Sequence, residues 1–473
     1  MVQSQTLNFL VPSLHPNTLI DLSFPSPSLG LVPSAPEPIV QHLPIKYGEH
    51  HPLGRAKRMV KTGDERVIIA DDKFQISTLE LSPLDQEEAS PPVVVAQESV
   101  KGRKKDIWAG MTGVQGGVVS ALTSGLLTYH PTSKSGIEAE ETPKASSSRS
   151  VPSPLQCLTS TSASPHSFVT AGKEVDVSIW DIERTFGSSS GGMEEDGPAR
   201  TWEGGKRKKN VYEVGQIWQA KNVPQNNLSL RQPINHLCLT YLNDSPHLLV
   251  SGTKAGTIRR FDLRQRKPLS DWKVAREGGI GCVASGVEQE LFFSDQSNLL
   301  SSLDLRTGKP LYTYSQMTCT AHQLIPIPSF SAEVESGSRQ VGLGSISSDA
   351  TFRLHTTTTP PSEGQRGNFG GEGKKGEILS MVGGVGVGEG VFRGYSQRDI
   401  SPPKVEREGG VGEGDGEEGE EEEDDEKVWE EMSEVVDQGR EMSEDEYSDS
   451  ESDVGEEDRV VIRNKPKKRV RKV

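Results

Sequence analysis

The residue types best suited to binding lie in one stretch of the chain, QIWQAKNVPQNNLSLRQPIN (216–235). A guanidinium such as that of Arg231 can form a bidentate bond to a carboxylate or a phosphate, and Lys221 can add a point charge beside it. Asn222 adds an amide to these two cations. We therefore interpret Lys221, Asn222 and Arg231 as a partner-binding set on a loop, where proteins built on a rigid scaffold commonly make their contacts.

A structural alternative fits the same stretch. As an internal strap, the segment would pack its apolar side chains beneath the fold, while its cations bond to backbone carbonyls. These apolar side chains are Trp218, Val223, Leu228 and Leu230. We favour a mixed role, in which the apolar residues anchor the segment and the polar residues face a partner.

The rest of the sequence contains little that could support catalysis. GDGEEG (414–419) matches the GxGxxG pattern formally, but it follows no expected strand and places carboxylates where a pyrophosphate would sit. The histidine pair in GEHHPLG (48–54) has no second pair of ligands with metal-binding spacing. Four cysteines without such spacing are expected to be reduced and structural; they are Cys157, Cys238, Cys282 and Cys319. We expect no enzyme, no cofactor, no metal site and no small-molecule substrate.

Seven segments of the chain share one strand-like pattern. Each has an apolar run, a short turn rich in Gly, Ser, Asp and Lys, and a second alternating run, as in a β-hairpin. The segments are 9–22, 67–81, 118–130, 168–181, 248–262, 291–304 and 341–355. The acid or histidine near each end is separated from the next by 59, 50, 51, 81, 42 and 51 positions, and a repeat of about 40–50 residues is typical of propeller blades. The sequence therefore predicts an all-β fold, a seven-bladed WD-type β-propeller.

Composition predicts where this propeller is interrupted and where it ends. Residues 134–154 and 187–210 are rich in Ser, Gly, Pro and charge, so we expect mobile insertions there. The ring must also close, because an open ring would leave strand edges unpaired. Strand-like sequence after 355 is confined to 376–387, and we expect a strand within 376–393 to return to the first blade. The propeller would then span 1–395.

Charge is unevenly distributed along the chain, whose net charge is −16. Residues 401–458 contain 27 acidic against 4 basic residues, whereas 459–473 contains 8 basic residues and no acid, which leaves 1–400 nearly neutral. Self-repulsion predicts a disordered acidic tail over 396–458. The basic segment 459–473 suits nuclear import or phosphate contacts, and its cations of interest are Lys465, Lys467, Lys468, Arg469, Arg471 and Lys472. Shorter basic clusters at 101–105, 206–209 and 264–267 are interpreted as solvated charge in turns.

One part of the acidic tail has an apolar stripe. Residues near 427–437 repeat apolar side chains at helical spacing, which predicts a short helix there. We interpret Trp429 and Met432 on this stripe as a docking element. Acid-flanked serines further on are candidate phosphorylation sites, namely Ser448, Ser450 and Ser452.

The N-terminal sequence has no basic n-region, and no apolar segment approaches the ~18–20 residues that span a bilayer. We expect an intracellular protein with no membrane partner.

The central stretch also carries a resemblance. IWQAKNVPQNNLSLRQPI (217–234), preceded by FVTAGKEVDVSIWDIE (168–183), resembles the nucleolar WD-repeat ribosome-biogenesis factor family that includes Nop-seven-associated protein one and WD repeat-containing protein 74. The residues that fit the family segment are Ala220, Lys221, Asn222, Val223, Leu228, Leu230, Arg231, Pro233 and Ile234. Ser229 replaces the family's acidic residue and Asn235 replaces its Trp. The likeness extends more weakly over about 60–395 and to EKVWEEM in the tail.

The resemblance implies a function that composition and spacing cannot supply. It implies a non-enzymatic assembly factor of the large (60S) ribosomal subunit precursor, located in the nucleus and nucleolus. Its partners would be the pre-ribosomal particle, neighbouring assembly factors and rRNA, and a nuclear AAA-type ATPase would release it. The alternative is a WD-repeat adaptor for a nuclear protein complex unrelated to ribosomes.

Overall fold

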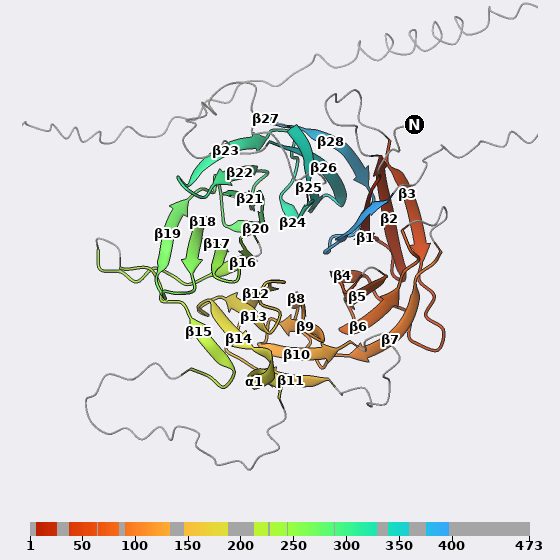
Figure 1. The fold of residues 1–473 in the computed structure, drawn as a ribbon, viewed down its shortest axis with the longest axis horizontal. Helices are drawn as coiled ribbons and strands as arrows, with labels where there is room; N and C mark the ends of the chain where they lie inside the picture. Colours follow the sequence, from red (N-terminus) through yellow and green to blue (C-terminus); the bar gives the residue numbers. More distant parts are fainter. Residues whose placement is uncertain are drawn as a thin grey trace, which may run out of the picture. The chain divides into compact units, whose positions relative to one another are not determined.

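Seven small antiparallel sheets succeed one another around a ring (Figure 1). The structure is a computed structural model that describes residues 6–25, 37–63, 65–84, 90–132, 146–187, 212–225, 228–243, 245–287, 289–328, 339–358 and 375–396. Within these residues it contains 29 strands and one short helix, α1 (Ile182–Phe186). The chain is a seven-bladed β-propeller, as predicted.

Each blade runs from an inner strand near the ring axis to an outer strand at the rim (Figure 1). The first three blades are β29 (Val391–Ser396), β1 (Thr6–Pro12), β2 (Thr18–Pro25) and β3 (Ile39–Pro44); β4 (Ala56–Lys61), β5 (Arg66–Asp71), β6 (Gln75–Glu80) and β7 (Val93–Ser99); and β8 (Trp108–Val114), β9 (Gly117–Leu122), β10 (Leu126–Pro131) and β11 (Ser147–Ser150). The next two are β12 (Leu155–Ser160), β13 (Ser167–Gly172), β14 (Ser178–Asp181) and β15 (Gln216–Gln219); and β16 (His236–Tyr241), β17 (Leu248–Thr253), β18 (Thr257–Asp262) and β19 (Pro268–Lys273).

The sixth and seventh blades share a segment of chain. The sixth is β20 (Ile280–Ser285), β21 (Glu290–Asp295), β22 (Leu300–Asp304) and β23 (Lys309–Tyr314), and the seventh is β24 (Ala321–Pro326), β25 (Arg339–Ser347), β26 (Thr351–Thr358) and β28 (Ile378–Gly383). Between β26 and β28, β27 (Lys375–Gly376) adds in parallel to the outer edge of β23.

The seven predicted hairpins are the two middle strands of the seven blades. Middle strands have a neighbouring blade on each face, so both sets of alternating side chains are buried and the sequence is nearly continuously apolar or small. All seven residues of β1 are buried, as are all six of β13. Outer strands face solvent on one side, and β19 alternates half-buried and exposed residues along its length.

Blades are held together by the apolar side chains between them. Seven clusters of buried side chains occur in the described residues, one between each pair of neighbouring blades. The cluster between the seventh and first blades is the most aromatic, with the ring of Phe9 centred 5.0 Å from that of Phe352 and 5.2 Å from that of Phe392. Since every blade uses both faces, removing one blade would expose two such clusters.

Ring closure is confirmed, but the strand expected to perform it was wrongly chosen. Residues 378–383 form the outer strand of the seventh blade and pair with β26. The strand that returns to the first blade is β29, which pairs antiparallel with β1. The glycine-rich run between β28 and β29 makes the crossing possible: a Cβ at Gly386 would lie 2.4 Å from the carbonyl oxygen of Ser13, and one at Gly388 would lie 2.7 Å from that of Ala56.

A buried ion pair joins the closing strand to the first blade. The Arg393 guanidinium on β29 lies 3.6 Å from the Asp21 carboxylate on β2, with side chains 2% and 1% exposed. Arg393 Nη2 also donates to the carbonyl of Ser82, at 2.6 Å. Burying a charged pair is costly, so its main contribution is to the unique placement of the strand, whereas removing one partner alone is strongly unfavourable.

The first insertion was predicted too long at its C-terminal end. Within 134–154, Ser147–Ser150 is the outer strand of the third blade and pairs with β10. Its sequence, SSRS, has no apolar alternation because it lies at the rim with half-buried and exposed positions. The remainder of that prediction over 134–145, the insertion at 188–210 and the tail beyond 396 lie outside the described residues, and so do Trp429, Met432, the candidate phosphoserines and the terminal cations.

A buried glutamate links the sixth and seventh blades. Glu290 accepts hydrogen bonds from Ser302 Oγ and from Tyr312 Oη, the latter at 2.7 Å. Tyr312 Oη in turn accepts from the backbone N–H of Thr358, at 3.2 Å. Burial raises the pKa of Glu290 to about 7, although both hydroxyl bonds act in the opposite direction.

We predict that Arg393→Met lowers the free energy of unfolding by about 3–5 kcal/mol, because the Asp21 carboxylate stays buried without the guanidinium. Adding Asp21→Asn to the same chain should recover part of that loss. Chemical denaturation of the two variants and the wild type measures both effects. Equal losses in the single and double variants would show that packing, not charge, holds the strand.

We also predict a change in pH dependence for Glu290→Gln. The folded-state pKa of Glu290 lies above its unfolded value, so its contribution to stability is present below about pH 4.5 and is lost as pH rises through about 7. Because glutamine has no proton to lose, the variant should gain stability relative to wild type over this interval, by up to about 3 kcal/mol. Unfolding free energies at pH 5 and pH 8 test this, and parallel curves for the two proteins would contradict it.

Candidate functional site

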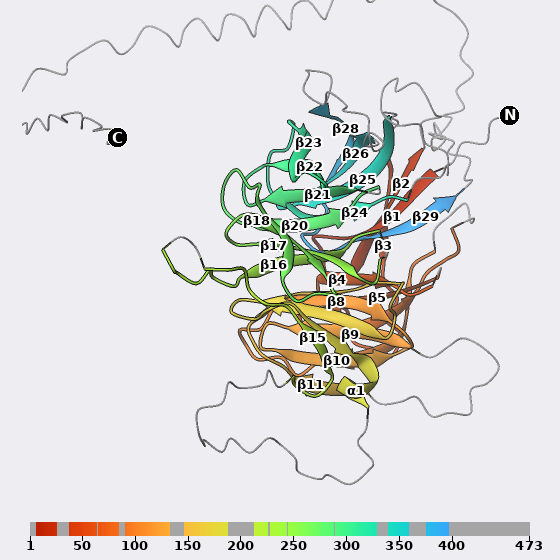
Figure 2. The same cartoon turned by 60° about the vertical axis from the view of Figure 1, so that its left-hand side comes forward.

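The segment from 221 to 234, called the arm below, stands out from the ring between the fourth and fifth blades (Figure 2). It follows β15 at the rim and leads to β16 near the axis. Both ends are fastened to the turn that joins β13 to β14. The N–H of Ala220 donates to the carbonyl of Val177, and the N–H of Glu174 donates to that of Ile234, each at 2.8 Å. Ala220 and Ile234 are buried.

Asn222 has an internal role that differs from its predicted partner-facing role. Its Nδ2 donates to the carbonyl of Gln232 at 2.6 Å, which ties the outgoing and returning sides of the arm together. Its Oδ1 accepts from the N–H of Val223 at 2.9 Å and from Arg259 Nη1 at 3.3 Å. Asn222 therefore fixes the base of the arm to β18 of the next blade.

The backbone of Lys221 is hydrogen-bonded to the next blade, whereas the residue is exposed to solvent. Its N–H donates to the carbonyl of Arg266 at 2.7 Å, and Arg266 Nε returns a bond to the carbonyl of Gln219 at 2.8 Å. The Arg266 guanidinium also lies over the ring of Tyr212, 5.7 Å from its centre. One cation of the cluster 264–267, expected to be solvated, is thus part of the base of the arm.

Arg231 is exposed on the returning side of the arm. Its charge lies close enough to the half-buried Asp176 to lower the pKa of that carboxyl, as do those of Arg259 and Arg266, but burial is the larger effect and the pKa of Asp176 is raised overall. Two arginines from the fifth blade and one from the arm therefore act on Asp176, and the neighbouring Glu174 acts in the opposite direction. Arg259 is also paired with Asp271, at 3.3 Å, so acids and cations are both present at this place.

The apolar residues of the arm divide into two groups. Trp218, on the strand before it, packs between the fourth and fifth blades, edge-on to Phe261 at 6.4 Å, and Val223 is half-buried, as the anchoring role predicts. Leu228 and Leu230 are 76% and 59% exposed, so the expectation that they pack beneath the fold was wrong. The arm has a fastened base and two leucines displayed to solvent.

A serine, a histidine and a glutamate form the chain of hydrogen bonds that serine hydrolases use, which the sequence did not reveal. Ser120 Oγ lies 3.0 Å from His130 Nε2, and His130 Nδ1 lies 2.8 Å from Glu98 Oε2. Ser120 is 1% exposed in the middle of the third blade, so its hydroxyl is closed to a substrate. Burial lowers the pKa of His130.

Two other blades repeat the serine–histidine contact. His236 Nδ1 lies 3.0 Å from Ser251 Oγ, and His355 Nε2 lies 2.8 Å from Ser345 Oγ, all four residues being buried. Burial lowers the pKa of both imidazoles to about 3, with nearby arginines adding to the effect. The repetition in three blades indicates a structural brace, since buried polar groups need hydrogen-bond partners.

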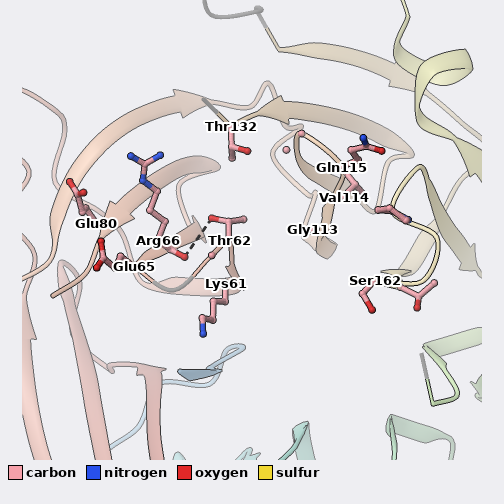
Figure 3. Close-up of a pocket in the computed structure, with 15 residues that line it drawn as sticks. Lys61, Thr62, Glu65, Arg66, Glu80, Gly113, Val114, Gln115, Thr132 and Ser162 are labelled. Carbon is pink, nitrogen blue, oxygen red and sulfur yellow. Dashed lines mark hydrogen bonds between the residues drawn. The ribbon is translucent and has the colours of Figure 1, made fainter. Parts of the chain in front are cut away.

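A cavity of about 910 Å³ lies among the turns of the second, third and fourth blades (Figure 3). Its lining surface is polar and apolar in nearly equal parts, with Lys61, Arg66, Glu65 and Glu80 supplying two charges of each sign. Lys61 Nζ donates to the carbonyl of Arg393 at 2.7 Å. Pockets for small organic ligands are mostly apolar, with a few convergent polar groups, and this lining differs from that description.

Among the described residues, no group of three or more His, Cys, Asp or Glu side chains is arranged to hold a metal ion. No described helix is long and apolar enough to cross a bilayer.

Known proteins similar to this chain give no more information on its fold than the strand topology does. No protein-family model matches the chain, and no curated protein matches it. Among solved structures, it is similar to the WD40 β-propeller domain of Doa1, with 9% sequence identity and a TM-score of 0.43 over 69% of this chain and 82% of that one. The seven blades themselves, not this distant likeness, establish the fold.

We predict that Asn222→Ala lowers the free energy of unfolding by about 1–2 kcal/mol, because the variant leaves the carbonyl of Gln232 and the Arg259 guanidinium without their amide partner. It should also make the arm more susceptible to limited proteolysis. The double variant Lys221→Ala, Arg231→Ala is the control and should melt like wild type, because both side chains are exposed. If the control loses several degrees instead, the arm is an internal strap.

Proposed function

We propose that this protein is a non-enzymatic assembly factor of the large ribosomal subunit, in which the propeller is a scaffold and the arm binds a neighbour on the pre-ribosomal particle. A closed ring of blades is rigid, and loops on rigid scaffolds commonly carry binding residues. The ribosomal part of the proposal rests on the resemblance of 217–234 to the ribosome-biogenesis family.

The observation that carries the proposal is the exposure of the two leucines on an arm whose base is fastened. A loop that only joined β15 to β16 would gain nothing from displaying Leu228 and Leu230 to water, since burying a leucine side chain is worth roughly 1.5–3 kcal/mol. Ser229 between them has a left-handed backbone, with φ of 58°, which is unfavourable for a residue other than glycine. Both features are understandable if a partner covers this part of the arm.

The charge beside the leucines indicates the kind of contact. Lys221 and Arg231 are exposed on the two sides of the arm, so an acidic or phosphate-bearing surface would complement it. Neighbouring assembly factors and rRNA both offer such surfaces. We further propose nucleolar location through the basic end of the chain, and release by a nuclear AAA-type ATPase, both as the resemblance implies.

Burial argues against catalysis at the one place where the described residues form a triad-like grouping. The hydrogen-bonded Ser120, His130 and Glu98 are arranged like a triad, but a nucleophile must reach its substrate. Ser120 lies in the middle of a blade and is closed to solvent.

We predict that Leu228→Ser, Leu230→Ser in the tagged full-length chain leaves the fold intact but removes the protein from pre-ribosomal fractions of a sucrose gradient. The expected loss of co-sedimentation follows from the loss of the apolar contact. Leu269→Ser is the matched control, because Leu269 is 47% exposed on β19, outside the arm. Melting temperatures and sequencing of the associated RNA complete the measurement.

Two outcomes would count against this function. If the wild-type chain carries no large-subunit precursor RNA, the adaptor of an unrelated nuclear complex becomes the better interpretation. If the double-serine variant sediments like wild type, the arm is not the contact.

A further inference from the structure

Basic side chains gather at the axis side of the ring, far along the chain from the arm. Lys57 and Arg58 lie on β4 and His322 lies on β24, and both strands are inner strands. Lys57 and His322 occupy equivalent places. In each of these strands the pairing register shifts across the second residue, which is therefore an extra, bulged residue.

Residues 389–390, which lead into the closing strand, bond to both of these strands. The N–H of Glu389 donates to the carbonyl of Lys57 at 3.0 Å. Gly390 exchanges two hydrogen bonds with the Gln323 amide, at 2.7 and 2.9 Å. The carbonyl of Lys57 and the side chain of Gln323, next to His322, thus bond to consecutive residues of one segment, which brings Lys57 and His322 to the same part of the inner wall.

We call this set the axial cluster; its members are Lys57, Arg58, His322 and Glu389. It contains three basic groups and one acid. Arg58 donates to Glu389 and, at 3.0 Å, to the carbonyl of Trp108, so the single carboxylate of the cluster is engaged by Arg58. The structure records no hydrogen bond for the side chain of Lys57 or of His322 among the described residues. The inner strand of the sixth blade, β20, has the same bulge, and its bulged residue is Gly281. This glycine is exposed and adds no side chain there.

The two cations of the axial cluster, Lys57 and Arg58, disfavour a charge on His322. The His322 residue is exposed, and desolvation by nearby protein atoms is the main cause that lowers its pKa to about 4. The charges of Arg58 and Lys57 lower it further. The ring is therefore neutral at neutral pH, and groups whose charge is disfavoured in this way are concentrated at functional sites.

We propose that the axial cluster is a binding site for a small phosphate-bearing anion, held by Lys57 and His322 in the field of Arg58. Phosphate fits better than a carboxylate because its double charge matches the two cations Lys57 and Arg58, and its several oxygens can accept from Lys57 and from the N–H of the neutral His322 ring. The anion would contact the second and seventh blades together, on either side of the closing strand. This site is separate from the arm and does not depend on the ribosomal proposal.

The test follows the His322 ring by NMR in the full-length chain with ¹³C-labelled histidine. The resonance is assigned by its absence in His322→Gln. Inorganic phosphate and myo-inositol hexakisphosphate are titrated separately at constant ionic strength, with chloride as the counter-salt. We expect a saturable shift of the His322 resonance with at least one probe, and a raised pKa of His322 in its presence. A response to phosphate identifies a free anion as sufficient, whereas a response to the hexakisphosphate alone identifies an ester.

Matched variants separate this site from general charge effects, including those of the basic C-terminal segment. Lys57→Gln should weaken the apparent affinity by roughly fivefold, the order expected for one accessible ion pair. Lys309→Gln removes an exposed cation from the outer strand of the sixth blade and should change nothing. The proposal is wrong if His322 shows no saturable shift with either probe, or if Lys57→Gln and Lys309→Gln behave alike.

Discussion

Closure of the ring by β29 is the constraint on which the rest of this structure depends. A blade buries its two faces only against its neighbours, so the apolar clusters exist together or not at all. The first blade takes its inner strand from the far end of the propeller, 385 positions along the chain from Thr6 to Val391. The pairing of β1 with β29 is therefore long-range, and it holds the first and last strands of the propeller together.

The closing strand is specified by polar groups as well as by packing. Phe392 joins the aromatic cluster around Phe9, but an apolar contact alone tolerates slippage. The Arg393–Asp21 pair and the contact of Asn8 Nδ2 with Ser396 Oγ at 2.9 Å each require one register. The same logic applies to the buried Ser–His contacts of the other blades. Such groups contribute less to net stability than to a unique arrangement.

Rigidity at the ring allows exposed features elsewhere. The base of the arm is joined to two blades through Asn222, Arg259 and Arg266, which lets Leu228 and Leu230 stand in solvent without collapsing onto the surface. The axial cluster is an analogous case, because the 389–390 segment holds like charges near one another. In both places, hydrogen bonds at the base hold an arrangement that the exposed or charged side chains by themselves would disfavour.

The sequence by itself determined the middle strands, the number of blades and the location of the arm. Alternation and burial on both faces leave a strong local pattern in segments such as 168–181, because each residue's environment repeats every second position. Tertiary structure alone decided the rest. The SSRS strand and the closing strand VFRGYS carry weak patterns, since an outer strand has one covered face and an inner strand mixes buried and half-buried positions.

The roles of individual site residues also depended on tertiary structure. Asn222 could not be recognised as an internal tie, because its partner Arg259 lies 37 positions away and belongs to the next blade. Leu228 and Leu230 have the composition of anchors, and their exposure follows from how far the arm extends from the ring. Local sequence encodes periodicity, whereas a contact between blades depends on which turns the closed ring brings together.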